Sequence, residues 1–191
     1  MNTPLEILKT HWNYNQFRAP QEEIINAIIR SEDCIVLLPT GGGKSICYQV
    51  PALLLEGVCI VISPLIALIK DQVNSLLEKN IKAIALTSQL NQEEIIIAFD
   101  NLQFGGFKFL YLSPERLQTE MILAKVHLMN VSLIAIDEAH CISQWGYDFR
   151  PAYLKISTLT ELIPEVPVIA LTATATQKVV LDLADKLLLH K

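Results

Sequence analysis

The chain alternates short, nearly continuous apolar runs with longer stretches in which apolar residues recur every three or four positions. The short runs are typical of strands buried on both faces of a parallel sheet, and the longer stretches are typical of amphipathic helices. The predicted strands are Cys34–Leu38, Val58–Ser63, Lys82–Thr87, Lys108–Leu112, Val131–Ile136 and Val168–Leu171. The helices predicted around them include Pro4–His11, Pro20–Arg30, Pro64–Lys79 and Gln92–Leu102.

Strands that alternate with helices predict an α/β fold with a mostly parallel sheet and helices on both faces. The 191 residues contain no internal repeat, low-complexity tract or linker, so we expect one domain over residues 1–191. Ligands of such a sheet bind beyond the carboxyl ends of its strands. Residues that carry chemistry should therefore follow the strands directly.

Composition excludes several classes of protein. Hydrophobic residues make up 51% of the chain and charged residues 18%, which is an ordinary globular mixture. The longest apolar stretch, Val58–Ile69, is interrupted by Ser63 and Pro64 and is shorter than the roughly 20 residues that span a bilayer. The first residues lack the basic region of a signal peptide. We therefore expect neither membrane insertion nor export.

The four cysteines include no C-x-x-C pair, so neither a zinc site nor a redox pair is predicted. Cys34 and Cys59 lie inside apolar runs and are expected to be core thiols. Free thiols fit a reducing compartment, so the expected location is cytoplasmic (the bacterial nucleoid) or nuclear.

The net charge of −5 argues against a nucleic-acid partner, because such proteins often carry a basic face and this chain has no basic cluster. On composition alone, a protein that never touches DNA is favoured. Any DNA contact must use a few local donors and backbone amides, and only motifs can reverse the expectation.

A glycine-rich loop follows the first predicted strand, with the sequence Pro39-Thr40-Gly41-Gly42-Gly43-Lys44-Ser45. The glycines allow backbone N–H groups to converge on an anion, and the helix predicted to begin at Lys44 points its positive end at the same place. Lys44 can reach the β- and γ-phosphates of ATP, and the Ser45 hydroxyl can ligate Mg²⁺. Leu38 stands where the G-x-x-x-x-G-K-[ST] pattern has its first glycine. The alternative interpretation is a glycine-rich turn before a helix.

Two carboxylates follow the predicted strand Val131–Ile136, in the tetrad Asp137-Glu138-Ala139-His140. Beside a phosphate-binding loop, Asp137 would hold Mg²⁺ and Glu138 would orient and deprotonate the attacking water. His140 either links the nucleotide site to a DNA site or only caps local structure, and the residues alone leave both roles open.

The tetrad joined to this loop resembles the superfamily 2 helicases, and three further segments narrow the resemblance to the RecQ family of ATP-dependent DNA helicases. The first is Tyr14–Gln21, which is similar to the family's adenine-recognition motif and lies within residues 1–31. The resemblance implies that Tyr14 stacks on adenine, Arg18 supports the nucleotide and Gln21 hydrogen-bonds the adenine edge. Trp12-Asn13 replaces the usual Phe-Gly. The alternative is a helix cap followed by an amphipathic helix.

The second segment is Cys141–Tyr153, which follows the tetrad directly and resembles the aromatic-rich loop of the family. In the family this loop senses single-stranded DNA and couples it to hydrolysis. The resemblance assigns DNA binding or coupling to Gln144, Trp145, Phe149 and Arg150. Aromatic rings offer faces for base stacking and arginine offers charge. Without the neighbouring tetrad, core aromatics would be the better interpretation.

The third segment is Ala170–Thr176, which resembles the helicase motif that couples hydrolysis to unwinding through residues such as Thr172 and Thr174. Thr174 and Gln177 also predict a capping box for the next helix. Two weaker matches, Val61–Leu65 and Ser113–Leu117, each follow a strand and open a helix. In the family such segments touch the DNA backbone, here through Ser63, Pro64 and Ser113. Helix N-termini bind phosphate without basic side chains.

The resemblance covers about residues 5–188 and implies the N-terminal RecA-like, P-loop NTPase domain of such a helicase. It implies ATP and Mg²⁺ as cofactors, single-stranded and duplex DNA as partners, a monomer, and 3′–5′ unwinding coupled to ATP hydrolysis in the intact protein. We expect the second motor domain to be absent beyond Lys191, and residues 1–191 alone to be nearly inactive. Two alternatives remain, a nucleotide-binding module without turnover and an RNA helicase of the Asp-Glu-Ala-His type.

Overall fold

The computed structural model describes residues 2–39 and 43–189, and its described residues form a six-stranded sheet. The strands are β1 (Cys34–Leu37), β2 (Val58–Ile62), β3 (Ala83–Leu86), β4 (Phe109–Leu112), β5 (Val131–Ile136) and β6 (Val168–Thr172). Each predicted strand is therefore confirmed, with its ends moved by one residue or less at most positions. Every pair of neighbouring strands is parallel, in the order β1-β6-β5-β2-β4-β3.

Helices fill the connections between the strands. The α-helices are α1 (Pro4–Trp12), α2 (Gln21–Ile29), α3 (Ile46–Leu54), α4 (Ile66–Glu78), α5 (Gln92–Phe104), α6 (Glu120–Leu128), α7 (Ile156–Leu162) and α8 (Gln177–Lys186). Three short 3-10 helices are interspersed among the described residues, η1 (Pro114–Gln118), η2 (Ala139–Ile142) and η3 (Pro151–Lys155).

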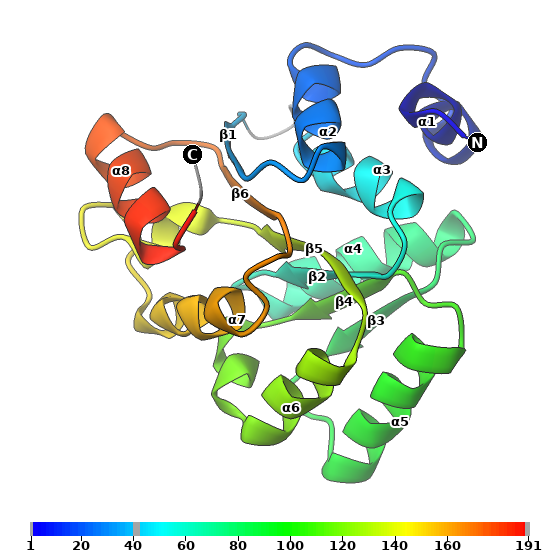
Figure 1. Cartoon of the computed structure of the whole chain (residues 1–191), viewed down its shortest axis with the longest axis vertical. Helices are drawn as coiled ribbons and strands as arrows, with labels where there is room; N and C mark the ends of the chain where they lie inside the picture. The colour runs from blue at the N-terminus through cyan, green and yellow to red at the C-terminus, as the bar shows by residue number, and fades with distance from the viewer. Residues whose placement is uncertain (1, 40–42, 190–191) are drawn as a thin grey trace.

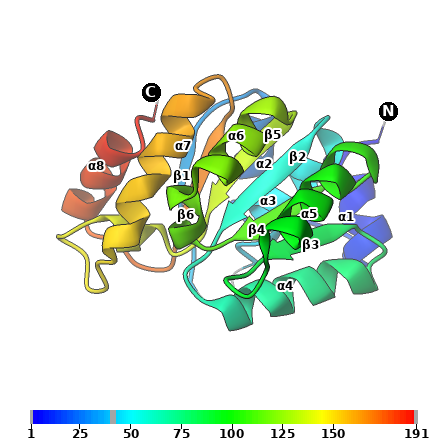
Figure 2. The ribbon, with the colours of Figure 1, turned by 90° about the horizontal axis from the view of Figure 1, so that it is seen from below.

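Alternate residues of the strands pack into two separate apolar layers. In β5, Ile134 and Ile136 join a core with α5, α6, α7 and α8, while Leu133 and Ala135 join a core with α2, α3 and α4. This period of two is the geometry of a strand, and burial on both faces explains why the runs are almost wholly apolar. The helices accordingly cover both faces of the sheet, as Figures 1 and 2 show, and the predicted fold class is confirmed.

The strand order brings distant segments of the chain together at the carboxyl edge of the sheet. Because β6 lies between β1 and β5, the glycine-rich loop, Thr172 and Asp137 follow neighbouring strands. Backbone hydrogen bonds continue past the strand ends, from Leu38 N–H to the Thr172 carbonyl and from Asp137 N–H to the Ile62 carbonyl. The backbone on either side of the candidate site is thus fixed to the sheet.

Three local expectations need correction. The helix after the loop, α3, begins at Ile46 with Ser45 as its N-cap, not at Lys44. The cap of α8 is Thr176, whose hydroxyl accepts a hydrogen bond from Val179 N–H, so the predicted Thr174 cap is wrong. Cys59 is buried, but Cys34 is only half-buried because β1 is an edge strand.

Among the described residues, none of the helices is both long enough and apolar enough to cross a membrane.

Candidate active site

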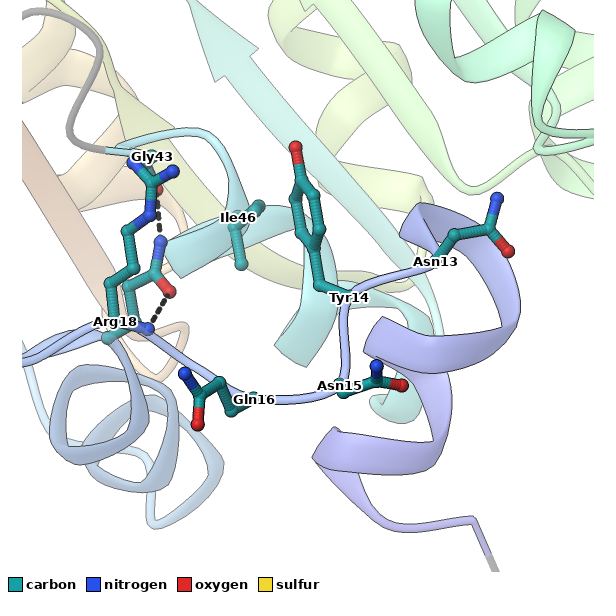
Figure 3. A pocket seen from close by; sticks show the side chains of 8 residues that line it. Asn13, Tyr14, Asn15, Gln16, Arg18, Gly43 and Ile46 are labelled. Atoms are coloured by element: carbon teal, nitrogen blue, oxygen red, sulfur yellow. Dashed lines mark hydrogen bonds between the residues drawn. The ribbon is translucent and has the colours of Figure 1, made fainter.

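A cavity of about 510 Å³ lies where the segment after α1 meets the start of α3 (Figure 3). Tyr14, Arg18 and Gln21 line it from one segment, and Gly43 and Ile46 line it from the other. In Figure 3 the Ile46 side chain lies between the Tyr14 ring and the Arg18 side chain. The structure thus brings the three residues predicted to hold adenine next to the described end of the glycine-rich loop.

Backbone groups fix the orientation of the Gln21 amide. Its Oε1 accepts a hydrogen bond of 2.8 Å from Arg18 N–H, and its Nε2 donates one of 3.1 Å to the Gly43 carbonyl. A flipped amide would place its NH₂ group against the Arg18 N–H and its oxygen against the Gly43 carbonyl, so only one orientation is compatible with both bonds. Oε1 keeps one lone pair and Nε2 keeps one proton. Together they complement adenine, which offers a donor at N6 beside an acceptor at N7.

Asn13 ends α1 in the left-handed region, with φ 60° and ψ 26°. A residue with a Cβ is disfavoured there, but glycine and asparagine tolerate it. The family glycine that Asn13 replaces would suit the same conformation. The substitution therefore preserves the turn that leads from α1 into Tyr14.

Lys44 lies against both acidic residues of the tetrad. Its ammonium nitrogen is 3.9 Å from Oδ1 of Asp137 and 3.6 Å from Oε1 of Glu138. The Ser45 hydroxyl makes no capping hydrogen bond within the described part of the chain. The structure brings one cation against two carboxylates, and Ser45 is the next residue after Lys44; ammonium, carboxylate and hydroxyl groups are suited to a phosphate and a hard divalent cation.

Asp137 lies in an environment that disfavours its charge, and Glu138 has a strained backbone. Burial raises the pKa of Asp137 above its ordinary value; the Lys44 ammonium opposes this rise and the Glu138 charge adds to it. Glu138 has φ 51° and ψ 43°, a left-handed conformation that costs a non-glycine residue about 1–2 kcal/mol. Such strain is concentrated at functional sites. An additional cation would stabilise the ionised carboxylate of Asp137 against the cost of burial.

His140 connects the acids to β6. Its Nε2 is 3.6 Å from Oε2 of Glu138, and its Nδ1 is 2.7 Å from Oγ1 of Thr172. The single hydroxyl proton of Thr172 is donated to the Thr174 carbonyl, so Nδ1 must carry the proton of its own hydrogen bond. Burial lowers the pKa of His140, which favours the neutral ring with an unprotonated Nε2 toward Glu138.

The aromatic-rich loop is exposed on one side and anchored on the other. Trp145 is 62% exposed and Tyr147 is 75% exposed, while Gln144 is exposed and Phe149 is half-buried. The Tyr147 ring stacks on His140, with centroids 4.7 Å apart and planes 16° apart. Core packing is therefore not the role of Trp145, and the loop contacts the tetrad through Tyr147.

The anchors of this loop were not predicted. The Tyr153 hydroxyl donates to the Asp137 carbonyl over 2.9 Å, and the buried Ser143 hydroxyl donates to Asp182 of α8 over 2.7 Å. Lys178 of α8 lies over the Trp145 ring. Tyr153 and Ser143 lie within the segment Cys141–Tyr153, but nothing in a single sequence indicates that α8 packs against this loop.

The segments expected to touch the DNA backbone differ in accessibility. Ser63 is 3% exposed: its hydroxyl is buried without a hydrogen-bond partner among the described residues, and its backbone N–H donates to the Leu112 carbonyl, so neither group reaches a phosphate in this geometry. Pro64 and Ser113 are half-buried, and Thr174 is exposed. Thr172 is fully buried, and its hydroxyl is hydrogen-bonded to His140 and to the Thr174 carbonyl.

Thr40, Gly41 and Gly42, which the sequence assigns to phosphate binding, lie outside the described residues.

His140, Cys141 and Asp148 bring three potential metal-ligand atoms within 4.8 Å of one another. Burial raises the pKa of the Cys141 thiol to about 12, so it is protonated at neutral pH. Asp148 is ion-paired with Arg150 over 3.4 Å, and His140 is hydrogen-bonded to Thr172. These ligands are already engaged, and the cluster is not a metal centre candidate.

Comparison with known proteins identifies the family. The model of the DEAD/DEAH box helicase family matches residues 18–183, which is most of the chain. The chain belongs to the DEAD/DEAH box helicase family. Within that family, this helicase domain is 45% identical over 192 residues to the ATP-dependent DNA helicase RecQ of Haemophilus influenzae, covering 99% of this chain and 31% of the relative.

A second relative, the ATP-dependent DNA helicase RecQ of Bacillus subtilis, is 46% identical over 187 residues, covering 97% of this chain and 32% of the relative. The resemblance to RecQ helicases is thereby confirmed, and the chain spans about a third of the length of these relatives. The helicase domain of Pyrococcus furiosus Hef superposes with a TM-score of 0.71 at 24% identity, over 91% of this chain and 37% of that one. That likeness supports the fold alone.

Proposed function

We propose that this chain is the ATP-binding motor domain of a RecQ-like 3′–5′ DNA helicase, in which ATP hydrolysis is coupled to DNA unwinding. The observation that carries the proposal is the contact of Lys44 with Asp137 and Glu138 beside the cavity of Tyr14 and Gln21. The RecQ relatives are ATP-dependent DNA helicases, which supports DNA as the nucleic acid and ATP as the nucleotide.

In the proposed nucleotide complex, Tyr14 stacks on adenine, Gln21 reads its edge and Arg18 supports the nucleotide. Lys44 leaves the carboxylates and binds the β- and γ-phosphates. Its ion pairs with the two partly exposed acids are weak, whereas its charge-assisted hydrogen bonds to phosphate oxygens are strong. Glu138, released from Lys44, accepts a proton from the attacking water. Gly43, with the loop residues Thr40, Gly41 and Gly42, lines the phosphates.

The residues fit a Mg²⁺ ion, because the raised pKa of Asp137 marks a buried carboxylate that lacks full compensation and the Ser45 hydroxyl has no capping bond among the described residues. Ser45 and Asp137 would hold it. A bound Mg²⁺ would neutralise charge on the phosphates during phosphoryl transfer.

The coupling to DNA is proposed to run from the aromatic-rich loop to the acids. The path is Tyr147 stacked on His140, and His140 3.6 Å from Glu138. A base that stacks on the loop therefore acts on residues one contact away from the proposed general base. Trp145, Phe149, Gln144 and Arg150 supply the DNA-facing surface, with Pro64, Ser113 and Thr174 as further candidates.

The RNA-helicase alternative is not favoured, because the RecQ relatives are named as DNA helicases. A nucleotide-binding module without turnover has no specific observation in its favour, since Glu138 is retained beside Lys44.

The test is the binding of fluorescent ATP with Mg²⁺, measured with and without single-stranded oligothymidylate. Sites that are coupled change each other's affinities by the same factor, typically about 5- to 150-fold. We expect single-stranded DNA to change the ATP affinity in the wild-type chain and to have no effect in the Phe149→Ala variant, whose ATP affinity without DNA stays normal. Equal ATP affinity with and without DNA in the wild type would remove the coupling from the proposal.

A further inference from the structure

One side chain of α8 covers the ring that DNA is proposed to use. The ammonium nitrogen of Lys178, in the first turn of α8, lies 3.4 Å from the centroid of the Trp145 ring. At this distance the cation rests directly on the ring face, in a cation–π contact. A base cannot stack on the same face until the ammonium leaves it. Both side chains are exposed, so neither is locked by packing.

A cavity of about 370 Å³ adjoins this contact. Its walls include Trp145 and Tyr147 from the aromatic-rich loop, Thr174 and Thr176 from the segment before α8, and Val179 of α8. Because one face of Tyr147 is already stacked on His140, the two exposed rings each have one face occupied by their own chain. The cavity offers room for a base beside the Trp145 ring, and the Lys178 ammonium on that ring is readily displaced.

The charges around this cavity single out Lys178. Arg150, the cation that the aromatic-rich loop itself provides, is paired with Asp148 over 3.4 Å. Lys178 makes no ion pair with any residue that the structure describes. Lys178, held only by an indole ring, is therefore recruited by a phosphate at a lower cost than Arg150, which must first leave Asp148.

We propose that Lys178 binds a phosphate of single-stranded DNA and that, without DNA, it is held on the face of Trp145 that the base will occupy. The proposal rests on the DNA binding proposed above. A base displaces the ammonium from the ring while the adjoining phosphate receives it, so stacking and phosphate binding occur together. Free anions offer no base, and duplex DNA keeps its bases stacked internally. The exchange therefore favours single strands.

The first test is the salt dependence of single-strand binding. Binding of oligothymidylate to the wild-type chain, Lys178→Met, Lys178→Arg and Lys186→Met is measured by fluorescence anisotropy between about 50 and 200 mM salt. Each phosphate contact with a single strand contributes about 0.7 to the slope of log K against log salt. Lys178→Met should lower the slope by about 0.7, so the wild type loses about 2.5-fold more affinity across this range. Lys178→Arg should keep the slope, as should Lys186→Met, which removes the same charge elsewhere on α8.

The second test observes the exchange itself. Nuclear Overhauser contacts between the Lys178 side chain and the Trp145 indole should be present in the free chain and lost when oligothymidylate is bound. Contacts that persist in the DNA complex would contradict the proposal, because Lys178 would still cover the ring.

The outcomes separate this inference from the function on which it rests. If Trp145→Ala weakens DNA binding while Lys178→Met leaves the salt slope unchanged, the DNA site stands and the role of Lys178 falls. If Lys178→Met binds more tightly at every salt concentration with an unchanged slope, Lys178 only blocks the ring and the proposal is wrong. If the wild-type chain shows no binding at low salt, both the DNA-binding function and this inference are contradicted.

Discussion

The Gln21 side chain donates a hydrogen bond of 3.1 Å to the carbonyl oxygen of Gly43, and so joins the cavity beside Tyr14 to the glycine-rich loop. A Cβ on Gly43 would meet Gln21 Nε2 at 2.2 Å, and Gly43 has φ +77°. Glycine is required at this position both by the backbone conformation and by the close approach of the amide. The two halves of the candidate site are thus one hydrogen-bonded unit.

This unit predicts the base preference. Guanine presents two acceptors where adenine presents a donor and an acceptor, so the fixed amide of Gln21 should reject it. We expect ATP to compete for fluorescent ATP and GTP to compete poorly. Gln21→Ala should weaken ATP binding by about 5- to 150-fold, the worth of two hydrogen bonds, and should remove the preference over GTP. A Gln21→Ala variant that still prefers ATP would refute the role assigned to this amide.

We expect the ionised carboxylate of Asp137 to lower the stability of the folded chain while it serves the proposed Mg²⁺ site. Its pKa is raised, so ionisation is less favourable in the folded chain than in the unfolded chain. The folded chain therefore loses stability as pH rises from the ordinary pKa of an aspartate, about 3.9, through the raised pKa of folded Asp137. Asp137→Asn should therefore raise the melting temperature of the ligand-free chain at pH 7.

The same substitution should abolish the stabilisation that ATP and Mg²⁺ confer. Each kcal/mol gained by the ligand-free Asp137→Asn chain corresponds to about 2–4 °C in a domain of this size. The gain should shrink as pH falls toward about 3, below the ordinary pKa of an aspartate, because the wild-type carboxyl is then protonated in both the folded and the unfolded chain. Thermal unfolding of both chains at the two pH values checks the prediction, and a lower melting temperature for Asp137→Asn at pH 7 would contradict it.

Thr172 should matter more than its neighbour Thr174. Thr172→Val leaves the buried Nδ1–H of His140 without an acceptor, at a cost of about 1–3 kcal/mol. Thr174→Val is the matched control, because that side chain is exposed. Urea unfolding at pH 7 measures both. Equal stabilities for the two variants would show that the bond between His140 and Thr172 contributes nothing.

Residues 1–191 alone should hydrolyse ATP slowly. Phosphoryl transfer needs positive charge beyond that of Lys44 and Mg²⁺, and an arginine finger is worth about 10³–10⁵ in rate. Of the chain's arginines, Arg18 lines the cavity of Tyr14 and Gln21, Arg150 pairs with Asp148 and Arg30 pairs with Glu32. Arg116 donates to the Thr87 carbonyl.

The comparison is a DNA-stimulated ATPase assay of residues 1–191 beside the RecQ of Haemophilus influenzae, a relative of which this chain matches 31%. Similar turnover numbers would contradict the expectation, unless cross-linking showed that a second copy supplies an arginine finger.

The strands were predictable because each is buried on both faces, and a run such as Leu133–Ile136 has few other interpretations. The pairing of Lys44 with Asp137 could be expected because ligand-binding residues of a parallel sheet gather beyond the carboxyl ends of its strands. The residues next to each of the two in the sequence do not by themselves indicate this contact. The contacts of α8 with the aromatic-rich loop could not be predicted. Lys178 over Trp145 depends on how α8 docks, and that is decided by tertiary packing around Leu183.

Helix caps were predicted less well for a related reason. Thr174 and Thr176 are chemically identical and two residues apart, and only the path of the chain after β6 decides which one caps α8. In the structure the Thr174 carbonyl accepts a hydrogen bond from the Thr172 hydroxyl, which leaves Thr176 to cap the helix.

The central claim is that Lys44, Asp137 and the cavity of Tyr14 and Gln21 form a nucleotide site. The most direct measurement is the affinity of fluorescent ATP with Mg²⁺ for the wild-type chain, Lys44→Ala and Lys70→Ala, an exposed lysine of α4 that serves as the control. We predict that the wild type and Lys70→Ala bind alike and that Lys44→Ala shows no measurable binding. Unchanged affinity in Lys44→Ala would contradict the account.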